Sequence, residues 1–350
     1  MLNRVTMAAT LTGLLVVNAQ GIQGAQPPSE NAEEPVALSL YLDNDVMTGS
    51  DNDYTGGFAV AFNGEDAREH PISIDGLLSQ TNHALGVEET FNHDLIRHIC
   101  EAGLAAFTPT DITTEEPIEN DRPYSSLVYI SNTKLLLSPD RKQSLMTTLS
   151  IGALGLGATG DIQNAIHGVI GSERAEGWDN QISEGGEPTA KYSATYQRYW
   201  DTGLDSLQAT SAAGLSLGYI TEAFVGSSIR TGAISTPPWS FNVFTSNYGE
   251  KANVTLPVPE KANAFYIVAG AKMKVRGYNA FLQGQFRDSE VSYSASEIRR
   301  LVAEGWIGIA SEFSGGFRLN FILRKQTSEL KTGLADRSFS YGEVITTYQF

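Results

Sequence analysis

The chain has 350 residues, with 40 acidic against 24 basic side chains and a single cysteine, Cys100. One cysteine excludes an internal disulfide and a zinc site built from cysteines, and a formal net charge of −16 argues against nucleic acid as a partner. After the first 35 residues there is no uninterrupted run of about 18 apolar residues, so the sequence predicts no transmembrane helix.

The start of the chain carries an export signal. Arg4 gives a positive start and precedes a mostly apolar stretch that ends in the small-residue cleavage site Val17-Asn18-Ala19. We therefore predict a signal peptide over residues 1–19, a flexible polar leader over 20–35 and a single barrel domain over 36–350.

Alternation of apolar and polar side chains is the strongest structural signal, and it is clearest over residues 264–276 and 316–324. The apolar face holds Phe265, Ile267, Ala269, Ala271, Met273, Val275, Phe317, Leu319, Phe321 and Leu323. The opposite face holds Tyr266, Gly270, Lys272, Lys274, Arg276, Arg318, Asn320 and Arg324. Repeated strands of this kind predict a lipid-facing exterior around a polar lumen. The aromatic end at Tyr348 and Phe350 is typical of a closing strand, and a secreted β-sandwich is the alternative.

Segments with strand character recur along the whole chain. They are 36–42, 55–63, 97–107, 124–137, 144–155, 190–200, 207–219, 264–275, 278–287, 303–312, 316–325 and 339–350. Their number is even, as bacterial barrels require. We therefore predict an all-β fold, a transmembrane antiparallel β-barrel of about twelve strands in the outer membrane of a Gram-negative bacterium, with a short helix in an extracellular loop.

With both termini in the periplasm, odd-numbered strands run outward, which assigns each connection to one side. The connections expected outside are 43–54, 108–123, 156–189, 220–263 and 288–302. Turns near 138–143, 201–206 and 276–277 are expected on the periplasmic side. Residues 64–96 also fall on that side, although periplasmic turns are usually short.

The hydrophobic period changes from two to 3.6 between Gly160 and Gly171, which predicts a short helix with Asp161 as N-cap. Its apolar stripe would be Ile162, Ala165, Ile166, Val169 and Ile170. Gln163 and His167 are four residues apart and therefore share one helix face. A lone histidine on a helix is more often structural. However, the other four histidines lie before or in the third strand, away from the outer face, and imidazole is the usual general base.

Other polar groups are expected at the same end of the barrel. Residues 43–45 (Asp-Asn-Asp) and 51–55 (Asp-Asn-Asp-Tyr-Thr) offer the oxygen ligands that calcium prefers, although a solvated loop tip has the same composition. Arg122 could anchor a phosphate or a carboxylate, with a loop salt bridge as the alternative. A Gly-x-Ser-x-Gly pattern at 214–218 matches serine hydrolases but lies inside a strand, so it is interpreted as barrel wall.

Three segments resemble the outer-membrane lipid A 3′-O-deacylase family. They read LDNDVMTGSDNDYTGG over 42–57, FTPTDI and NDRPYSS over 107–112 and 120–126, and IQNAIHGVIGSERAEGWDNQ over 162–181. The helix followed by GWDNQ is the most specific of these. The resemblance implies a Ca²⁺-dependent esterase that removes the 3′-O-linked acyloxyacyl chain from the lipid A of lipopolysaccharide. Its site would face outside, between the barrel wall and the loop helix.

The resemblance also implies residue roles. The catalytic positions would be His167, Gln163 and Glu173. The metal ligands would be Asp45 and Asn44, and the substrate-binding residues Thr55, Arg122 and Asn44. As in secreted phospholipases A2, the histidine would deprotonate a water that attacks the ester carbonyl, and Ca²⁺ would stabilise the oxyanion. The expected partners are lipopolysaccharide and outer-membrane lipid, and the protein is expected to be a monomer.

Two features depart from the family pattern: Ser125-Ser126 follows DRPY where a smaller Ala-Gly pair is expected, and residues 64–96 form an unusual insertion. Two other functions stay open from the sequence. One is an outer-membrane phospholipase with a serine nucleophile in the barrel wall, which needs a Ser–His pair. The other is a non-enzymatic channel or adhesion barrel, which predicts an open lumen and no need for an amphipathic loop helix.

Overall fold

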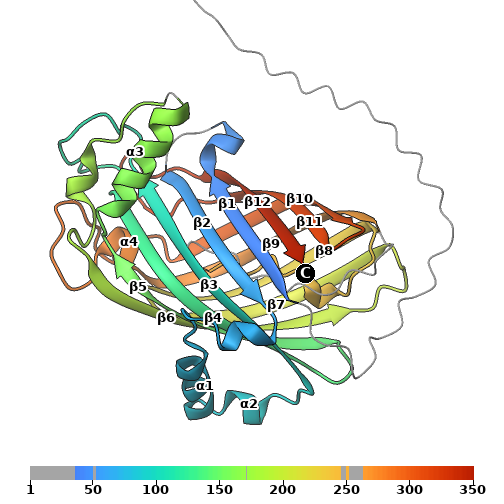
Figure 1. The fold of residues 1–350 in the computed structure, drawn as a ribbon. Coiled ribbons are helices and arrows are strands. Elements are labelled where there is room, and N and C mark those ends of the chain that lie inside the picture. The colour runs from blue at the N-terminus through green and yellow to red at the C-terminus, as the bar shows by residue number, and fades with distance from the viewer. Residues whose placement is uncertain (1–35, 50–52, 171, 246–249, 252–262) are drawn as a thin grey trace, which may run out of the picture. The chain divides into compact units, whose positions relative to one another are not determined.

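The computed structural model describes residues 36–49, 53–170, 172–245, 250–251 and 263–350 (Figure 1). The expected signal peptide and leader, residues 1–35, lie outside these ranges and stay predictions. Within the described ranges, no helix combines the length and the apolar composition needed to cross a membrane.

The strands of the described chain close into one antiparallel barrel of twelve. They are β1 (Ala37–Asn44), β2 (Asp53–Asn63), β3 (Leu95–Thr108), β4 (Ser125–Leu137), β5 (Gln143–Leu154), β6 (Glu187–Trp200), β7 (Leu207–Gly218), β8 (Ile220–Ala233), β9 (Ala264–Asn279), β10 (Leu301–Phe313), β11 (Phe317–Gln326) and β12 (Phe339–Gln349). Each strand pairs with its neighbour in sequence, and the barrel closes where Tyr41 of β1 lies opposite Ile345 of β12. The predicted fold class is therefore confirmed, including the role of the C-terminal segment as the closing strand.

The alternation read from the sequence separates the two faces of the wall. In β9, Ile267 is 43% exposed on the outside, whereas Lys274 is buried in the lumen. Buried charges need partners, and here Glu304 accepts from both Lys274 and Arg324 at 2.9 Å. The lumen is thus filled by paired charges rather than open.

Aromatic side chains fill the lumen near the end where β1 joins β2. The cluster contains Tyr54, Phe107, Tyr219, Phe281, Phe339 and Tyr341. The Tyr54 ring lies 5.1 Å from Phe107 and 4.9 Å from Tyr341, and Phe107 lies 5.0 Å from Phe281. Because these rings come from β2, β3 and β12, from the turn between β7 and β8 and from the segment after β9, they pack across the interior of the barrel.

Two of the predicted segments are wrong. Residues 220–233 form strand β8 and are not part of an outer loop, while 278–287 hold the end of β9, the short helix α4 (Ala280–Gln283) and the start of the following loop. The turn expected at 276–277 lies inside β9. β8 was missed because Phe224 points into the lumen and the outward row contains Ser227, so the alternation is weak. The two errors offset each other in the strand count.

The connection from β8 to β9 therefore lies at the opposite end from the one expected for 220–263. Its described part contains the 3₁₀ turn η4 (Pro238–Ser240) and contributes Trp239, Phe241 and Phe244 to the core inside the barrel. Phe244 packs edge-on against Trp306 at 5.4 Å. This segment helps to fill the lumen from that end.

The insertion at 64–96 forms η2 (Glu65–Arg68), α1 (Asp75–Ala84) and α2 (Val87–Thr90) before β3 begins. It covers polar side chains that point outward from the wall. Asn82 donates to Thr147 of β5 at 2.9 Å and accepts from Tyr192 of β6 at 3.0 Å. Glu88 accepts from Lys134 of β4 at 2.9 Å. The insertion thus has a structural reason: it gives partners to polar groups that would otherwise face lipid.

Candidate functional site

Helix α3 (Ala158–Ile170) and the turn η1 (Asp45–Thr48) lie at the end of the barrel opposite α1 (Figure 1). The predicted loop helix is confirmed, although it begins at Ala158, so Asp161 lies in its first turn and is not the N-cap. The segment after α3 includes η3 (Gly177–Asn180). It packs on the wall through a cluster made of Ala106, Ile112, Tyr124, Ala175 and Trp178.

Gln163 and His167 contact each other on one face of α3, as their spacing predicts, with 3.5 Å between their Nε2 atoms. The Gln163 side chain is oriented by Trp178, whose indole Nε1 donates to Gln163 Oε1 at 2.7 Å. The amide nitrogen of Gln163 is therefore the atom that faces the imidazole. Sequence reasoning assigned no role to Trp178, although it lies in the GWDNQ motif.

The other imidazole nitrogen is held by the backbone. His167 Nδ1 donates to the carbonyl oxygen of Glu173. A carbonyl only accepts, so in the neutral imidazole the proton is on Nδ1 and the lone pair is on Nε2. Glu173 itself is exposed at its side chain, and it orients His167 through its main chain rather than its carboxylate.

Asn44, Asp45 and Thr55 come together at the end of β1 and the start of β2. Asn44 Nδ2 donates to the Thr55 carbonyl at 2.5 Å, and Asn44 Oδ1 caps η1 by accepting from the Val46 amide at 2.7 Å. Thr55 Oγ1 lies 2.6 Å from Thr108 Oγ1. The Asp45 side chain is fully buried beside them. These strand ends and α3 lie at the same end of the barrel (Figure 1).

The neighbouring acidic residues face the lumen instead. Asp43 accepts from Tyr54 at 2.8 Å and pairs with Lys251. Asp53 pairs with Arg337 at 2.8 Å. Residues 51 and 52 lie outside the described ranges. No three His, Cys, Asp or Glu side chains gather as a ready-made metal site in the described part of the chain.

Arg122 is 3% exposed and points inward from the loop before β4. Its Nε donates to Asp53 at 3.3 Å, its Nη2 pairs with Glu329, and its guanidinium lies 4.9 Å from the Phe107 ring centroid. This placement corresponds to the salt-bridge alternative, although Nη1 has no hydrogen-bond partner among the described residues. A bulge between Asp53 and Gly56 in β2 lets Asp53 reach the guanidinium.

Asp121 fixes the same loop. Burial alone would raise the pKa of Asp121, but backbone hydrogen bonds from Thr110 and Arg122 and the Arg337 guanidinium hold that pKa below its ordinary value. Each of the three bonds is 2.8 Å long.

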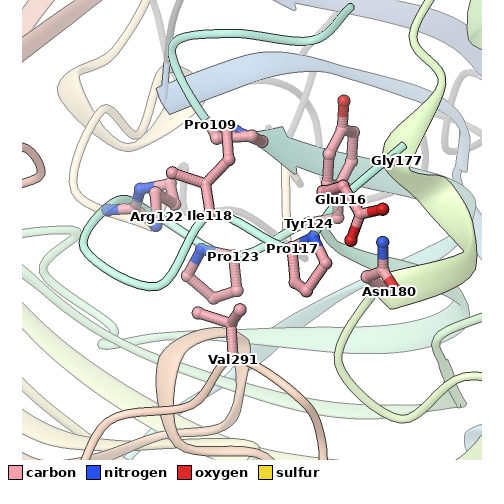
Figure 2. Close-up of a pocket in the computed structure, with 10 residues that line it drawn as sticks. All are labelled: Pro109, Glu116, Pro117, Ile118, Arg122, Pro123, Tyr124, Gly177, Asn180 and Val291. Atoms are coloured by element: carbon pink, nitrogen blue, oxygen red, sulfur yellow. The ribbon is translucent and has the colours of Figure 1, made fainter. Parts of the chain in front are cut away.

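The Ser125-Ser126 pair has a structural role. Both side chains are fully buried, and Ser126 Oγ donates to Gln181 Oε1 at 2.9 Å. This bond ties the segment after α3 to the wall at β4. A cavity of about 10 Å³ lies nearby, between the loop of Arg122 and Tyr124 and the turn at Gly177 (Figure 2). It has room for a water molecule at most, so it is not the substrate site.

Replacing Gly160 with alanine is expected to lower the esterase activity that the sequence predicts roughly tenfold, because a Cβ there would lie 2.7 Å from Cγ of Trp178 and displace the indole that orients Gln163. Gly168→Ala is the matched control in the same helix, since its Cβ would meet nothing within 4 Å. The control is expected to keep activity and to stabilise α3 by about 0.5–1 kcal/mol. Rates and unfolding midpoints of the two variants, measured in one detergent, check this. Equal rates would contradict it.

Comparisons with known proteins also identify an outer-membrane barrel. The family model described as outer membrane protein LpxR matches residues 6–350. Among solved structures, LpxR from Salmonella typhimurium has a TM-score of 0.68 at 17% identity, over 90% of this chain and 100% of that chain. At this identity the likeness concerns the fold.

Two other outer-membrane barrels are less similar. The β-domain of the Bordetella autotransporter BrkA has a TM-score of 0.41 at 10% identity, over 91% of this chain and 100% of that one. An outer membrane channel from Pseudomonas putida F1 has a TM-score of 0.43 at 7% identity, over 93% and 100%. No curated protein matches the sequence.

Proposed function

Since the chain belongs to the LpxR family of outer membrane proteins, we propose that it modifies lipid A as a Ca²⁺-dependent esterase that removes the 3′-O-linked acyloxyacyl chain. The observation that carries the proposal is the state of His167. Its Nδ1 proton is held by a carbonyl, which leaves Nε2 as a base. The site is proposed to face the outside of the outer membrane, where a lipid substrate can reach it, and the enzyme is proposed to act as a monomer.

In the proposed reaction, Nε2 of His167 takes a proton from water while the water oxygen attacks the ester carbonyl. The tetrahedral intermediate then collapses, and the bond between the acyl carbon and the sugar oxygen breaks. The imidazolium returns the proton to the sugar oxygen. Gln163 helps to position the water, and Asn44 and Thr55 contact the substrate. Ile162, which is 44% exposed on α3, offers apolar surface for the acyl chain.

Asn44 and Asp45 would hold the calcium ion. The buried carboxylate and the neighbouring amide are oxygen donors of the type that Ca²⁺ takes, and they are fewer than the six to eight that it needs. Water and lipid phosphate would complete the shell. When bound, the ion would supply positive charge that stabilises an oxyanion. The same charge would reduce the repulsion between the acidic side chains and an anionic lipid.

The other functions receive less support. A channel needs an open lumen, and the described lumen is packed with paired charges and aromatic rings. A phospholipase with a serine nucleophile needs a Ser–His pair, whereas the contacts of His167 are made with Gln163 and the Glu173 carbonyl.

The test uses purified full-length protein in detergent with purified lipid A, so that a chelator does not act on the cell envelope. Mass spectrometry is expected to detect loss of one acyloxyacyl group with Ca²⁺ present and intact lipid A after chelation. Asp45→Asn is expected to raise the Ca²⁺ concentration needed for half-maximal rate at least tenfold, since it removes a charged ligand. Unchanged lipid A with folded protein and Ca²⁺ would overturn the proposal.

A further inference from the structure

The segment that follows α3 folds back along the helix. Three side chains of α3 each contact a residue of this segment, in the pairs His167 with Glu173, Asn164 with Ala175, and Gln163 with Trp178. Later residues of the segment therefore contact earlier residues of the helix, so the two run in opposite directions. The middle pair lies one helical turn from His167.

The Asn164 carboxamide makes two hydrogen bonds with the backbone of a single residue. Its Nδ2 donates to the Ala175 carbonyl at 3.0 Å, and its Oδ1 accepts from the Ala175 amide at 2.8 Å. A carboxamide carries a donor and an acceptor side by side, which lets one side chain satisfy both polar groups of a backbone residue. The two bonds together fix the position and the orientation of Ala175 relative to the helix.

Ala175 is also anchored on its other side, to the loop between β3 and β4. It is 2% exposed in the cluster that contains Ile112, and the next residue, Glu176, donates its backbone N–H to the Ile112 carbonyl at 2.8 Å. The segment is thus joined to this loop on one side and to α3 on the other. Glu173 precedes Ala175 by two residues and has an exposed side chain, so the placement of its carbonyl depends on the backbone that Asn164 holds.

We propose that Asn164 is a positioning residue for His167. By holding Ala175 against α3, it keeps the Glu173 carbonyl at Nδ1 of the imidazole, and the neutral ring then carries its lone pair on Nε2. Without the two bonds the segment can move away from the helix, and a neutral imidazole that has lost the carbonyl can carry its proton on either nitrogen. The kinetic part of this inference rests on the proposed esterase function, whereas the part about the imidazole rests on the contacts alone.

The first test follows the His167 ring by NMR. Full-length protein labelled with ¹⁵N at its histidines is studied in detergent at about pH 8, where an imidazole is neutral. The wild type is expected to show a protonated Nδ1 and an unprotonated Nε2, which have well separated ¹⁵N shifts, and the His167→Ala spectrum assigns them. Asn164→Leu keeps the approximate volume of the side chain and removes both bonds. Its two ring shifts are expected to move toward each other as the ring exchanges between tautomers.

The second test measures lipid A hydrolysis by the same proteins with Ca²⁺ present. Asn164→Leu is expected to lower kcat roughly tenfold with little change in KM, because a displaced base is misaligned for proton transfer while the groups proposed to bind the substrate are unchanged. The loss is expected to be smaller than in His167→Ala, since the imidazole remains. Asn164→Ala, which favours the helix and cannot crowd the segment, is expected to give the same result.

Asn180→Leu is the matched control. Asn180 makes the same kind of bond, from Nδ2 to the Glu115 carbonyl at 2.6 Å, but to the loop between β3 and β4 rather than to α3. This variant is expected to keep both ring shifts and kcat. The unheated electrophoretic mobility of each variant verifies that its barrel is folded.

The inference is overturned if both Asn164 variants keep the wild-type ring shifts, if Asn180→Leu changes the shifts equally, or if the shifts change while kcat does not. A wild-type protein that leaves lipid A intact would overturn the proposed esterase function instead. In that case the ring shifts would still decide whether Asn164 positions His167.

Discussion

Replacing His167 with alanine is expected to lower the rate of lipid A ester hydrolysis by about 10²- to 10⁴-fold, the usual contribution of a positioned general base. The substitution removes the imidazole whose Nε2 faces Gln163 and whose neutral tautomer is set by the Glu173 carbonyl at Nδ1. The loss is expected mainly in kcat, because the residues proposed to contact the substrate, Asn44 and Thr55, are unchanged. Initial rates of fatty acid release from purified lipid A, at several lipid concentrations, separate kcat from KM.

Glu173→Gln is the matched control for this experiment. The variant keeps the backbone carbonyl that receives the His167 proton and changes only an exposed carboxylate, so its rate is expected to stay close to the wild-type rate. If Glu173→Gln instead falls as far as His167→Ala, the carboxylate takes part in the reaction and the role given to the carbonyl is wrong.

The barrel could be predicted from sequence because lipid outside and charge inside impose a period of two on every strand that follows the rule. β9 and β11 follow it closely, and both were placed with the correct face outward. β8 does not, because Phe224 fills lumen space and Gly226 faces inward beside Lys272. The alternation of apolar and polar side chains is lost wherever an aromatic ring points into the lumen or a small polar residue faces the lipid. Such a strand is not predicted from the pattern.

At the candidate site, spacing along a helix was sufficient for Gln163 and His167, since residues four apart must share a face. The orienting group of His167 could not be read from sequence, because a backbone carbonyl carries no side-chain signature. The direction of the Arg122 side chain could not be predicted from the sequence either. It depends on a bulge that shifts the register in β2 and brings Asp53 to the guanidinium, and bulges have no reliable sequence signal outside glycine positions.

Arg122 is expected to have the second large effect, on folding stability. Arg122→Gln removes a buried cation from Asp53 and Glu329, and breaking such pairs typically costs about 3–5 kcal/mol. We expect about 3 kcal/mol, the lower end, because Asp53 keeps Arg337 and Glu329 keeps Arg276 as cationic partners. Loss of the stacking on an aromatic ring of the lumen cluster adds to the effect.

The free energy of unfolding in urea, followed by tryptophan fluorescence of the refolded protein, measures this effect. The matched control is Arg174→Gln, which removes an exposed pair with Glu176 whose contact is 3.3 Å and whose arginine side chain is 70% exposed. Such pairs contribute at most about 1 kcal/mol, so the control midpoint is expected to move little. If Arg122→Gln unfolds like the wild type but raises KM for lipid A, the guanidinium serves the substrate. Arg122 would then be the phosphate anchor that the sequence first suggested, and the ion pairs with Asp53 and Glu329 would contribute little to folding.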